Sequence, residues 1–173
     1  MNTEKWKTGD TVIYSTAGVC RVNDIVTRIF NHENVDYYEL APIFDERSTC
    51  YVPVNYNAEK VHIESAMSKE QAAALLEYAA IAPPTEWINA PNERKQQYNQ
   101  IYRSGSREEK VRLIKALTLQ EQKQQAQNKH LYAADERVFS GCKAQIYNEL
   151  AYVLGKPAEE IETALAKTIR ETA

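Results

Sequence analysis

The sequence is poor in the residues that mark several familiar classes of protein. Its 173 residues include 3 cysteines, 5 glycines and 6 prolines, which excludes a collagen-like repeat and a disulfide-rich scaffold. No stretch approaches the roughly 20 consecutive apolar residues that a transmembrane helix requires. The net charge is only -3, so the chain as a whole gives no electrostatic indication of nucleic-acid binding. With 43% hydrophobic and 26% charged residues, the composition is that of an ordinary globular protein.

The three cysteines are far apart and form no metal-binding or redox motif. Cys20, Cys50 and Cys142 lack the CxxC and His-flanked spacings of zinc sites and disulfide-exchange sites. We therefore predict small, buried, unpaired thiols in a reducing compartment. The first seven residues contain no apolar segment of the kind that secretory signals have, so a cytoplasmic location is expected.

Residues 1–64 show the period-two alternation of β-strands and are rich in β-branched and aromatic residues. Four or five short strands with short turns, and no helix signal among them, predict a small antiparallel β-barrel. The clearest segments are 10–14, 19–30, 35–40 and 48–52, with polar loops at 31–34 and 45–47. Pro53 ends the last of these segments because proline cannot donate a ladder hydrogen bond.

Residues 65–173 change to the period of α-helices. Two capping-box patterns, Ser68 with Gln71 and Ser106 with Glu109, predict helix starts. Helices are expected at 68–80, at 91–103, from 106 towards about 130, around 138–153, and after residue 157. The sequence therefore predicts an α+β protein, in which a β domain at 1–64 is followed by a compact all-helical domain of about five helices at 65–173.

Charge is distributed unevenly along the helical part. Residues 94–143 contain 11 basic and 5 acidic residues, a net charge of +6 that the whole-chain balance conceals. No glycine-rich phosphate loop, HExxH, GxSxG or paired-cysteine motif is present, and His32, His62 and His130 are scattered. We therefore expect no enzymatic activity, no cofactor and no metal site.

Trp87 is the most informative single residue of the helical part. It lies in the proline-rich segment 83–91, just before a group of basic residues: Arg94, Lys95, Arg103 and Arg107. A loop tryptophan in this position can insert its ring between bases while basic side chains hold the phosphates. The alternative is that Trp87 packs two helices together as a core residue. The spacing of the residues leaves both possibilities open.

Several short segments, taken in order, match the pattern of one known family. In the first half these segments are Lys7–Tyr14, Ala17–Val19, Tyr37–Leu40 and Tyr51–Val54. In the second half they are Trp87 itself, Tyr98–Gly105 and Glu149–Ala151. Their order resembles the CarD/CdnL family of bacterial transcription regulators over nearly the full length of the chain. The N-terminal module of that family also occurs in the transcription-repair coupling factor.

The resemblance implies that residues 1–64 are a Tudor-like barrel that docks on the β subunit of RNA polymerase. It also implies that residues 65–173 bind promoter DNA at the upstream edge of the melted bubble and stabilise the open complex without reading sequence. Trp87 would act as a minor-groove wedge, with the DNA backbone held by Arg94, Lys95, Arg103 and Arg107. The polymerase contacts would be Arg28, Tyr51, Val52 and Pro53. The protein is expected to act as a monomer, associated with the nucleoid through polymerase, with no membrane contact.

Some positions depart from the family pattern. Tyr51 stands where a second polymerase-contacting arginine is usual, so that contact is either lost or replaced by stacking. Residues 89–90 are not basic, although basic residues often follow the family's tryptophan, and residues 94–95 are the candidates to replace them. Tyr132 occupies a helix start that serine often caps, so weak capping is expected there.

Three other functions are considered for this sequence, and each requires different residues. The first is an interaction module that binds polymerase or another partner without DNA contact, with Trp87 in the core. The second is a small-molecule enzyme on the helical half, for which no convergent acid, base or metal set is visible. The third is a sequence-specific repressor, for which residues 120–127 have suitable side chains but lack the turn of a helix-turn-helix.

Overall fold

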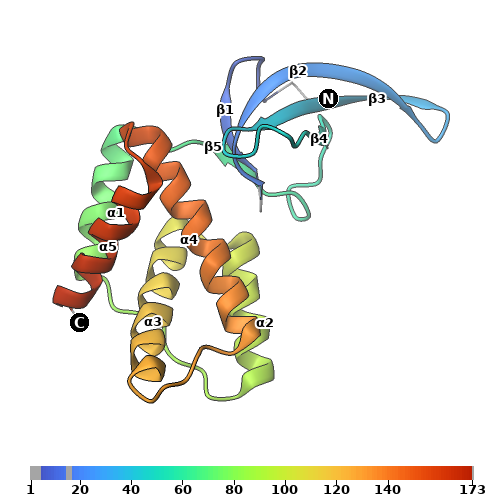
Figure 1. The fold of residues 1–173 in the computed structure, drawn as a ribbon. Coiled ribbons are helices and arrows are strands. Elements are labelled where there is room, and N and C mark those ends of the chain that lie inside the picture. The colour runs from blue at the N-terminus through green and yellow to red at the C-terminus, as the bar shows by residue number, and fades with distance from the viewer. Residues whose placement is uncertain (1–4, 15–16, 173) are drawn as a thin grey trace. The chain divides into compact units, whose positions relative to one another are not determined.

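The computed structural model describes residues 5–14 and 17–172, and the chain divides into two compact units between Ala66 and Met67 (Figure 1). Among these residues the first unit contains five strands and the second contains five helices. The predicted α+β class, with all strands preceding all helices, is therefore confirmed.

The strands of the first unit form one antiparallel sheet. They are β1 (Thr11–Tyr14), β2 (Gly18–Phe30), β3 (Glu33–Pro42), β4 (Cys50–Pro53) and β5 (Ile63–Ser65), in the order β4-β3-β2-β1-β5. One face packs on a small core made of Trp6, Val12, Cys20, Val22, Tyr38, Leu40, Val52 and Ile63. Within the described strands, β4 and β5 remain at opposite edges, so the hydrogen-bonded ladder does not close into the predicted barrel. Edge strands of 4 and 3 residues offer few backbone groups for a closing ladder.

The β2–β3 hairpin is much longer than the other strands (Figure 1). Its register pairs Phe30 with Glu33, so the connecting turn is the two residues Asn31 and His32, shorter than the predicted loop. Both have positive φ angles, 51° and 65°, as the favoured tight hairpin turn requires. A register shift between Val22 and Asp24 marks a bulge, a feature that increases the local twist of a strand.

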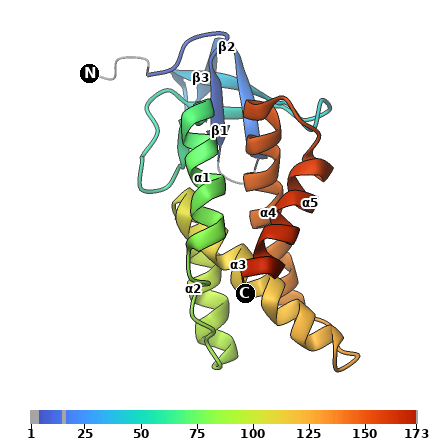
Figure 2. The ribbon, with the colours of Figure 1, turned by 90° about the vertical axis from the view of Figure 1, so that its left-hand side faces the viewer.

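The second unit contains α1 (Lys69–Ile81), α2 (Pro91–Ser104), α3 (Arg107–Gln125), α4 (Ala133–Leu154) and α5 (Ala158–Thr172). Both predicted capping boxes are confirmed: the Ser68 and Ser106 side chains accept hydrogen bonds from the third residue of α1 and α3. The longest helix, α4, packs against α2, α3 and α5. Figure 2 shows α4 beside α5. No helix in the described part of the chain combines the length and apolar composition of a membrane span.

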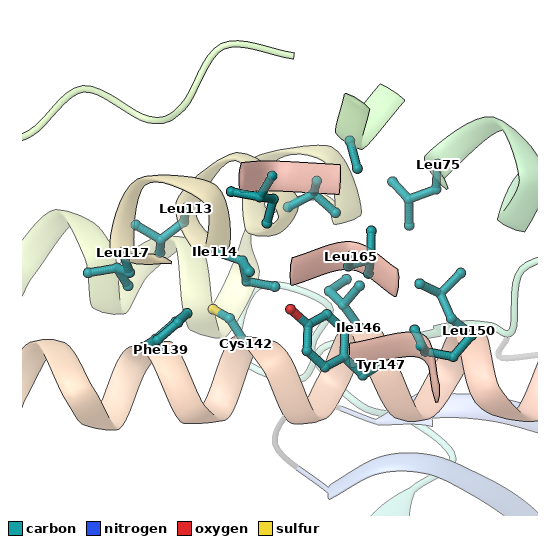
Figure 3. Close-up of a cluster of buried hydrophobic side chains, with 14 of the residues drawn as sticks. Leu75, Leu113, Ile114, Leu117, Phe139, Cys142, Ile146, Tyr147, Leu150 and Leu165 are labelled. Atoms are coloured by element: carbon teal, nitrogen blue, oxygen red, sulfur yellow. The ribbon is translucent and has the colours of Figure 1, made fainter. Parts of the chain in front are cut away.

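The core of the helical unit is apolar and draws on all its helices. Figure 3 shows side chains of α3, α4 and α5 meeting there, among them Leu113, Leu117, Phe139, Cys142, Ile146, Leu150 and Leu165. Burial raises the pKa of the Cys142 thiol to about 12, so this cysteine is an unreactive core residue. Cys20 is likewise buried with a pKa of about 12, whereas Cys50 is only half-buried. All three cysteines are free thiols, as predicted, but the prediction that all three are buried is wrong for Cys50.

Among the described residues of this unit, four charged side chains are buried: Arg94, Lys115, Asp135 and Glu149. Lys115 and Glu149 are satisfied by the following internal partners. The Lys115 ammonium donates to the carbonyl oxygens of Ala79 and Ala82 at the end of α1, at 3.3 and 2.9 Å. The Glu149 carboxylate, 2% exposed, forms an ion pair with Arg107 at 2.7 Å and accepts the Met67 backbone N–H at 2.9 Å. The second contact attaches the first residue of the helical unit to α4.

Removal of the Glu149 carboxylate tests how much this buried contact stabilises the helical unit. We expect Glu149→Ala to lower the free energy of unfolding by about 3 kcal/mol, because Arg107 and the Met67 N–H both lose their acceptor. The measurement is chemical denaturation followed by the helical circular dichroism signal. The matched control is Glu171→Ala, which removes an exposed ion pair to Lys167 and should cost less than about 1 kcal/mol. Equal losses in the two variants would contradict the assignment.

Candidate nucleic-acid and protein interfaces

The segment between α1 and α2 carries Trp87 and is held by side chains from the surrounding helices. The carbonyl oxygen of Glu86 accepts the Tyr98 hydroxyl at 2.9 Å, and that of Pro83 accepts Arg112 Nε at 3.1 Å. The Thr85 N–H donates to the carbonyl oxygen of Arg112 at 3.0 Å. These hydrogen bonds fix the backbone of the segment that carries Trp87.

The Trp87 ring is half-buried at the edge of the helical core. It meets the buried Tyr98 ring edge-on, with 6.2 Å between the centroids. Burial raises the pKa of the Tyr98 hydroxyl, which stays protonated as the donor to the loop. One part of the indole is therefore packed inside and the remainder is open to solvent. This placement combines features of the core residue and of the exposed wedge that the sequence left as alternatives.

Arg94 lies beneath Trp87 rather than beside it on the surface. Its side chain is 4% exposed, and its Nε lies 3.0 and 3.1 Å from the two carboxylate oxygens of Asp135. Nη1 donates to the carbonyl oxygen of Ile88 at 2.8 Å. The guanidinium carbon also lies 4.5 Å from the centroid of the Trp87 ring, a cation–π distance. In this position Arg94 supports the tryptophan and its loop, and its charge is not presented to solvent.

The other basic candidates divide into exposed and ion-paired side chains. Lys95 and Arg103, both on α2, are exposed. Arg107, at the start of α3, is 20% exposed and is paired with Glu149. Together with the buried Lys115, these placements reduce the surface charge of the basic stretch below what its residue count indicates.

Tyr132 is a surface aromatic residue that was not among the contacts predicted from the sequence. It precedes α4 as its N-cap residue, makes no side-chain capping bond and is 65% exposed. Its ring centroid lies 5.6 Å from the guanidinium carbon of Arg94, which therefore contacts both Trp87 and Tyr132. The signal in the sequence was an aromatic residue at a position where a small polar cap is favoured. Asp135 carried no comparable signal, because its partner is 41 residues away.

The predicted polymerase-contacting residues come together on the sheet of the first unit. The Arg28 guanidinium lies 3.8 Å from the centroid of the Tyr51 ring, so the pair is stacked. The Tyr51 hydroxyl donates to Glu39 at 3.4 Å. Pro53 is half-buried and pairs with Tyr37 in the ladder. Val52, in contrast, is 1% exposed and belongs to the core, so its side chain is not available on this surface.

We also looked for metal-binding groups among the residues that the structure describes. In residues 5–14 and 17–172, no group of three or more histidine, cysteine, aspartate or glutamate side chains is placed to hold a metal ion.

The position of Trp87 is expected to depend on the Arg94–Asp135 ion pair. Asp135→Asn leaves the buried guanidinium without its counter-charge, which should cost about 3–5 kcal/mol of stability. Under conditions where the variant stays folded, acrylamide should quench Trp87 fluorescence more strongly than in the parent. A Trp6→Phe background restricts emission to Trp87, since the chain has two tryptophans.

The matched control is Glu136→Gln, which changes an exposed neighbouring carboxylate and should leave quenching unchanged. A destabilised Asp135→Asn variant with parental quenching would show that the ion pair does not position the tryptophan.

Comparison with known proteins identifies the first unit. Residues 6–65 match the family model described as CarD-like/TRCF RID domain. The matched range spans all five strands and ends with β5, before the helices begin. No curated protein matches the chain.

Proposed function

Because residues 6–65 are a CarD-like RNA polymerase-interacting domain, we propose that this protein is a transcription regulator that binds the polymerase β subunit and stabilises the promoter open complex. The helical unit supplies the DNA contact in this proposal. The observation that carries it is the half-exposed Trp87 ring, held on a fixed segment by a buried arginine.

Polymerase binding is assigned to β4 and its neighbours. β4 is an edge strand of the described sheet, and such an edge can pair with a strand of a partner. Tyr51 lies on this edge strand, and Arg28 reaches its ring from β2. The stacked pair supplies a planar cation and an aromatic ring, two residue types enriched at protein interfaces. Val52 contributes through its backbone, because its side chain is buried.

DNA binding is assigned to Trp87 with the exposed basic residues of α2. A ring inserted in the minor groove must offset the loss of base stacking, a cost of a few kcal/mol per step. That cost is lowest where the duplex is already melting, so the ring binds the distorted fork better than closed duplex. The open complex gains stability only by this difference in binding free energy. A wedge that is already rigid loses little conformational entropy on binding.

The basic side chains have separate roles in this proposal. Lys95 and Arg103 are exposed and can hold phosphates, contacts that position a protein without reading sequence. Arg107 adds a partly exposed charge beside Glu149. Arg94 is a positioning residue for Trp87. Selectivity among promoters then follows the ease with which each one melts.

Attachment to polymerase explains how a chain with a net charge of -3 acts on DNA. A DNA-binding unit tethered through polymerase has a high effective concentration at the fork, so its intrinsic affinity for DNA can be weak. The competing proposal, a module that binds polymerase without touching DNA, is favoured by the packed part of the Trp87 ring. The two proposals predict different open-complex lifetimes when the Trp87 ring is removed.

Truncation of the ring tests the wedge. We expect this protein to lengthen the lifetime of a promoter open complex after competitor challenge, and Trp87→Ala to lose most of that extension while still binding polymerase. Trp87→Phe, which keeps a smaller ring, should retain part of it. A full extension by a folded Trp87→Ala variant would contradict the wedge and favour the module that does not contact DNA.

Truncation of the stacked pair tests polymerase binding. Arg28→Ala and Tyr51→Ala are each expected to weaken binding to RNA polymerase roughly tenfold, equivalent to about 1.4 kcal/mol. Binding is measured by titration with core polymerase. The control is Arg21→Ala, another exposed arginine on β2 that is not part of the stacked pair, which should change affinity little. Equal weakening by all three variants would show a general charge effect and contradict the assigned surface.

A further inference from the structure

Trp87 and Tyr132 both contact the same guanidinium, that of Arg94. The carbon of the Arg94 guanidinium is 4.5 Å from the Trp87 centroid and 5.6 Å from the Tyr132 centroid. Because Arg94 is itself 4% exposed, the two rings cover it and together form one aromatic patch. The segment before α2 provides one ring, and the start of α4 provides the other.

The exposed ring of Tyr132 does not serve its own helix. The N-cap position favours Ser, Thr, Asp or Asn, whose side chains accept a backbone N–H, and Tyr132 makes no such bond. Its ring is 65% exposed, so little of its apolar area is buried within the chain. Asp135, in the first turn of α4, anchors this end of the helix. Its carboxylate accepts hydrogen bonds from the buried Arg94. The local structure of α4 therefore gives no reason for a large ring here.

The chemistry around the patch fits an unpaired nucleobase. Aromatic rings at a protein surface stack on bases of any identity, and nearby cations hold the adjoining phosphates. Lys129 and Arg137 are exposed on either side of Tyr132 in the chain, and Lys95 is exposed on the helix that carries Arg94. The exposed carboxylates Glu93 and Glu136 also lie beside these residues in the chain, but the three cations outnumber them. This charge together with a flat ring suits single-stranded nucleic acid better than an apolar protein segment.

We propose that Tyr132 is a second aromatic contact, which stacks on an unpaired base of the melted strand next to the site where Trp87 enters the duplex. This inference rests on the proposed function, because it places the patch at the upstream fork. Trp87 disrupts stacking at the edge of the duplex, and Tyr132 replaces the stacking that the released base has lost.

The test uses polymerase with the full-length protein on fork DNA that carries 2-aminopurine at each unpaired position next to the junction. Stacking on Tyr132 should quench the 2-aminopurine at one of these positions. Tyr132→Ala should relieve that quenching and shorten the open-complex lifetime, reducing the extension about fivefold or more. Tyr132→Phe, which keeps the ring, should recover most of both signals. Ile81→Ala removes an exposed apolar side chain elsewhere in the helical unit and should change neither signal.

The outcomes separate this inference from the proposed function. If Trp87→Ala loses the lifetime extension and Tyr132→Ala keeps it, the wedge stands and the second contact is wrong. If neither variant changes the lifetime, the proposed function fails as well. If Tyr132→Ala loses the extension and also increases acrylamide quenching of Trp87 in the Trp6→Phe background, Tyr132 only positions the tryptophan and the stacking contact is overturned.

Discussion

The helical unit depends at its candidate site on one buried ion pair, between Arg94 of α2 and Asp135 of α4. Removing two charges from water is costly, and an ion pair compensates only when its geometry is good and its remaining groups are satisfied. Here Nε lies within 3.1 Å of both carboxylate oxygens, and Nη1 donates to the carbonyl of Ile88. The pair therefore joins two helices and the loop between α1 and α2 at a single point. Such a contact specifies geometry more than it adds stability.

The geometry that results suits the wedge role that we propose for the Trp87 ring. A tryptophan on a mobile loop would lose entropy on insertion, whereas this ring already rests on Arg94 and against Tyr98. The same arginine lies beneath Tyr132, so one charge supports two rings. The sheet unit has a separate role, because residues 6–65 match a CarD-like RNA polymerase-interacting domain. In the proposed function, polymerase binding by that domain supplies the concentration that a weakly charged DNA-binding unit lacks.

Much of the fold was predictable from local patterns, because strands, helices and their caps are encoded by neighbouring residues. The capping boxes at Ser68 and Ser106, the change of period after the strands and the family resemblance of the first unit are all of this kind. Whether the sheet closes was not predictable, since this depends on whether the two edge strands β4 and β5 pair with each other, which local patterns do not specify. The role of Arg94 was hidden for the same reason: a basic residue in a basic stretch resembles surface charge until its carboxylate partner, 41 residues away, is located.

The Trp87 ring is proposed to contact DNA at the upstream edge of the bubble, and photocrosslinking detects such a contact directly. Promoter DNA carrying 5-iodouracil at successive positions across that edge is assembled with polymerase and this protein, irradiated, and digested for mass spectrometry. If Trp87 is the wedge, the peptide that contains it crosslinks at one or two adjacent DNA positions, in the open complex and not on closed duplex. Polymerase-bound protein that crosslinks through other peptides only, or not at all, would contradict it.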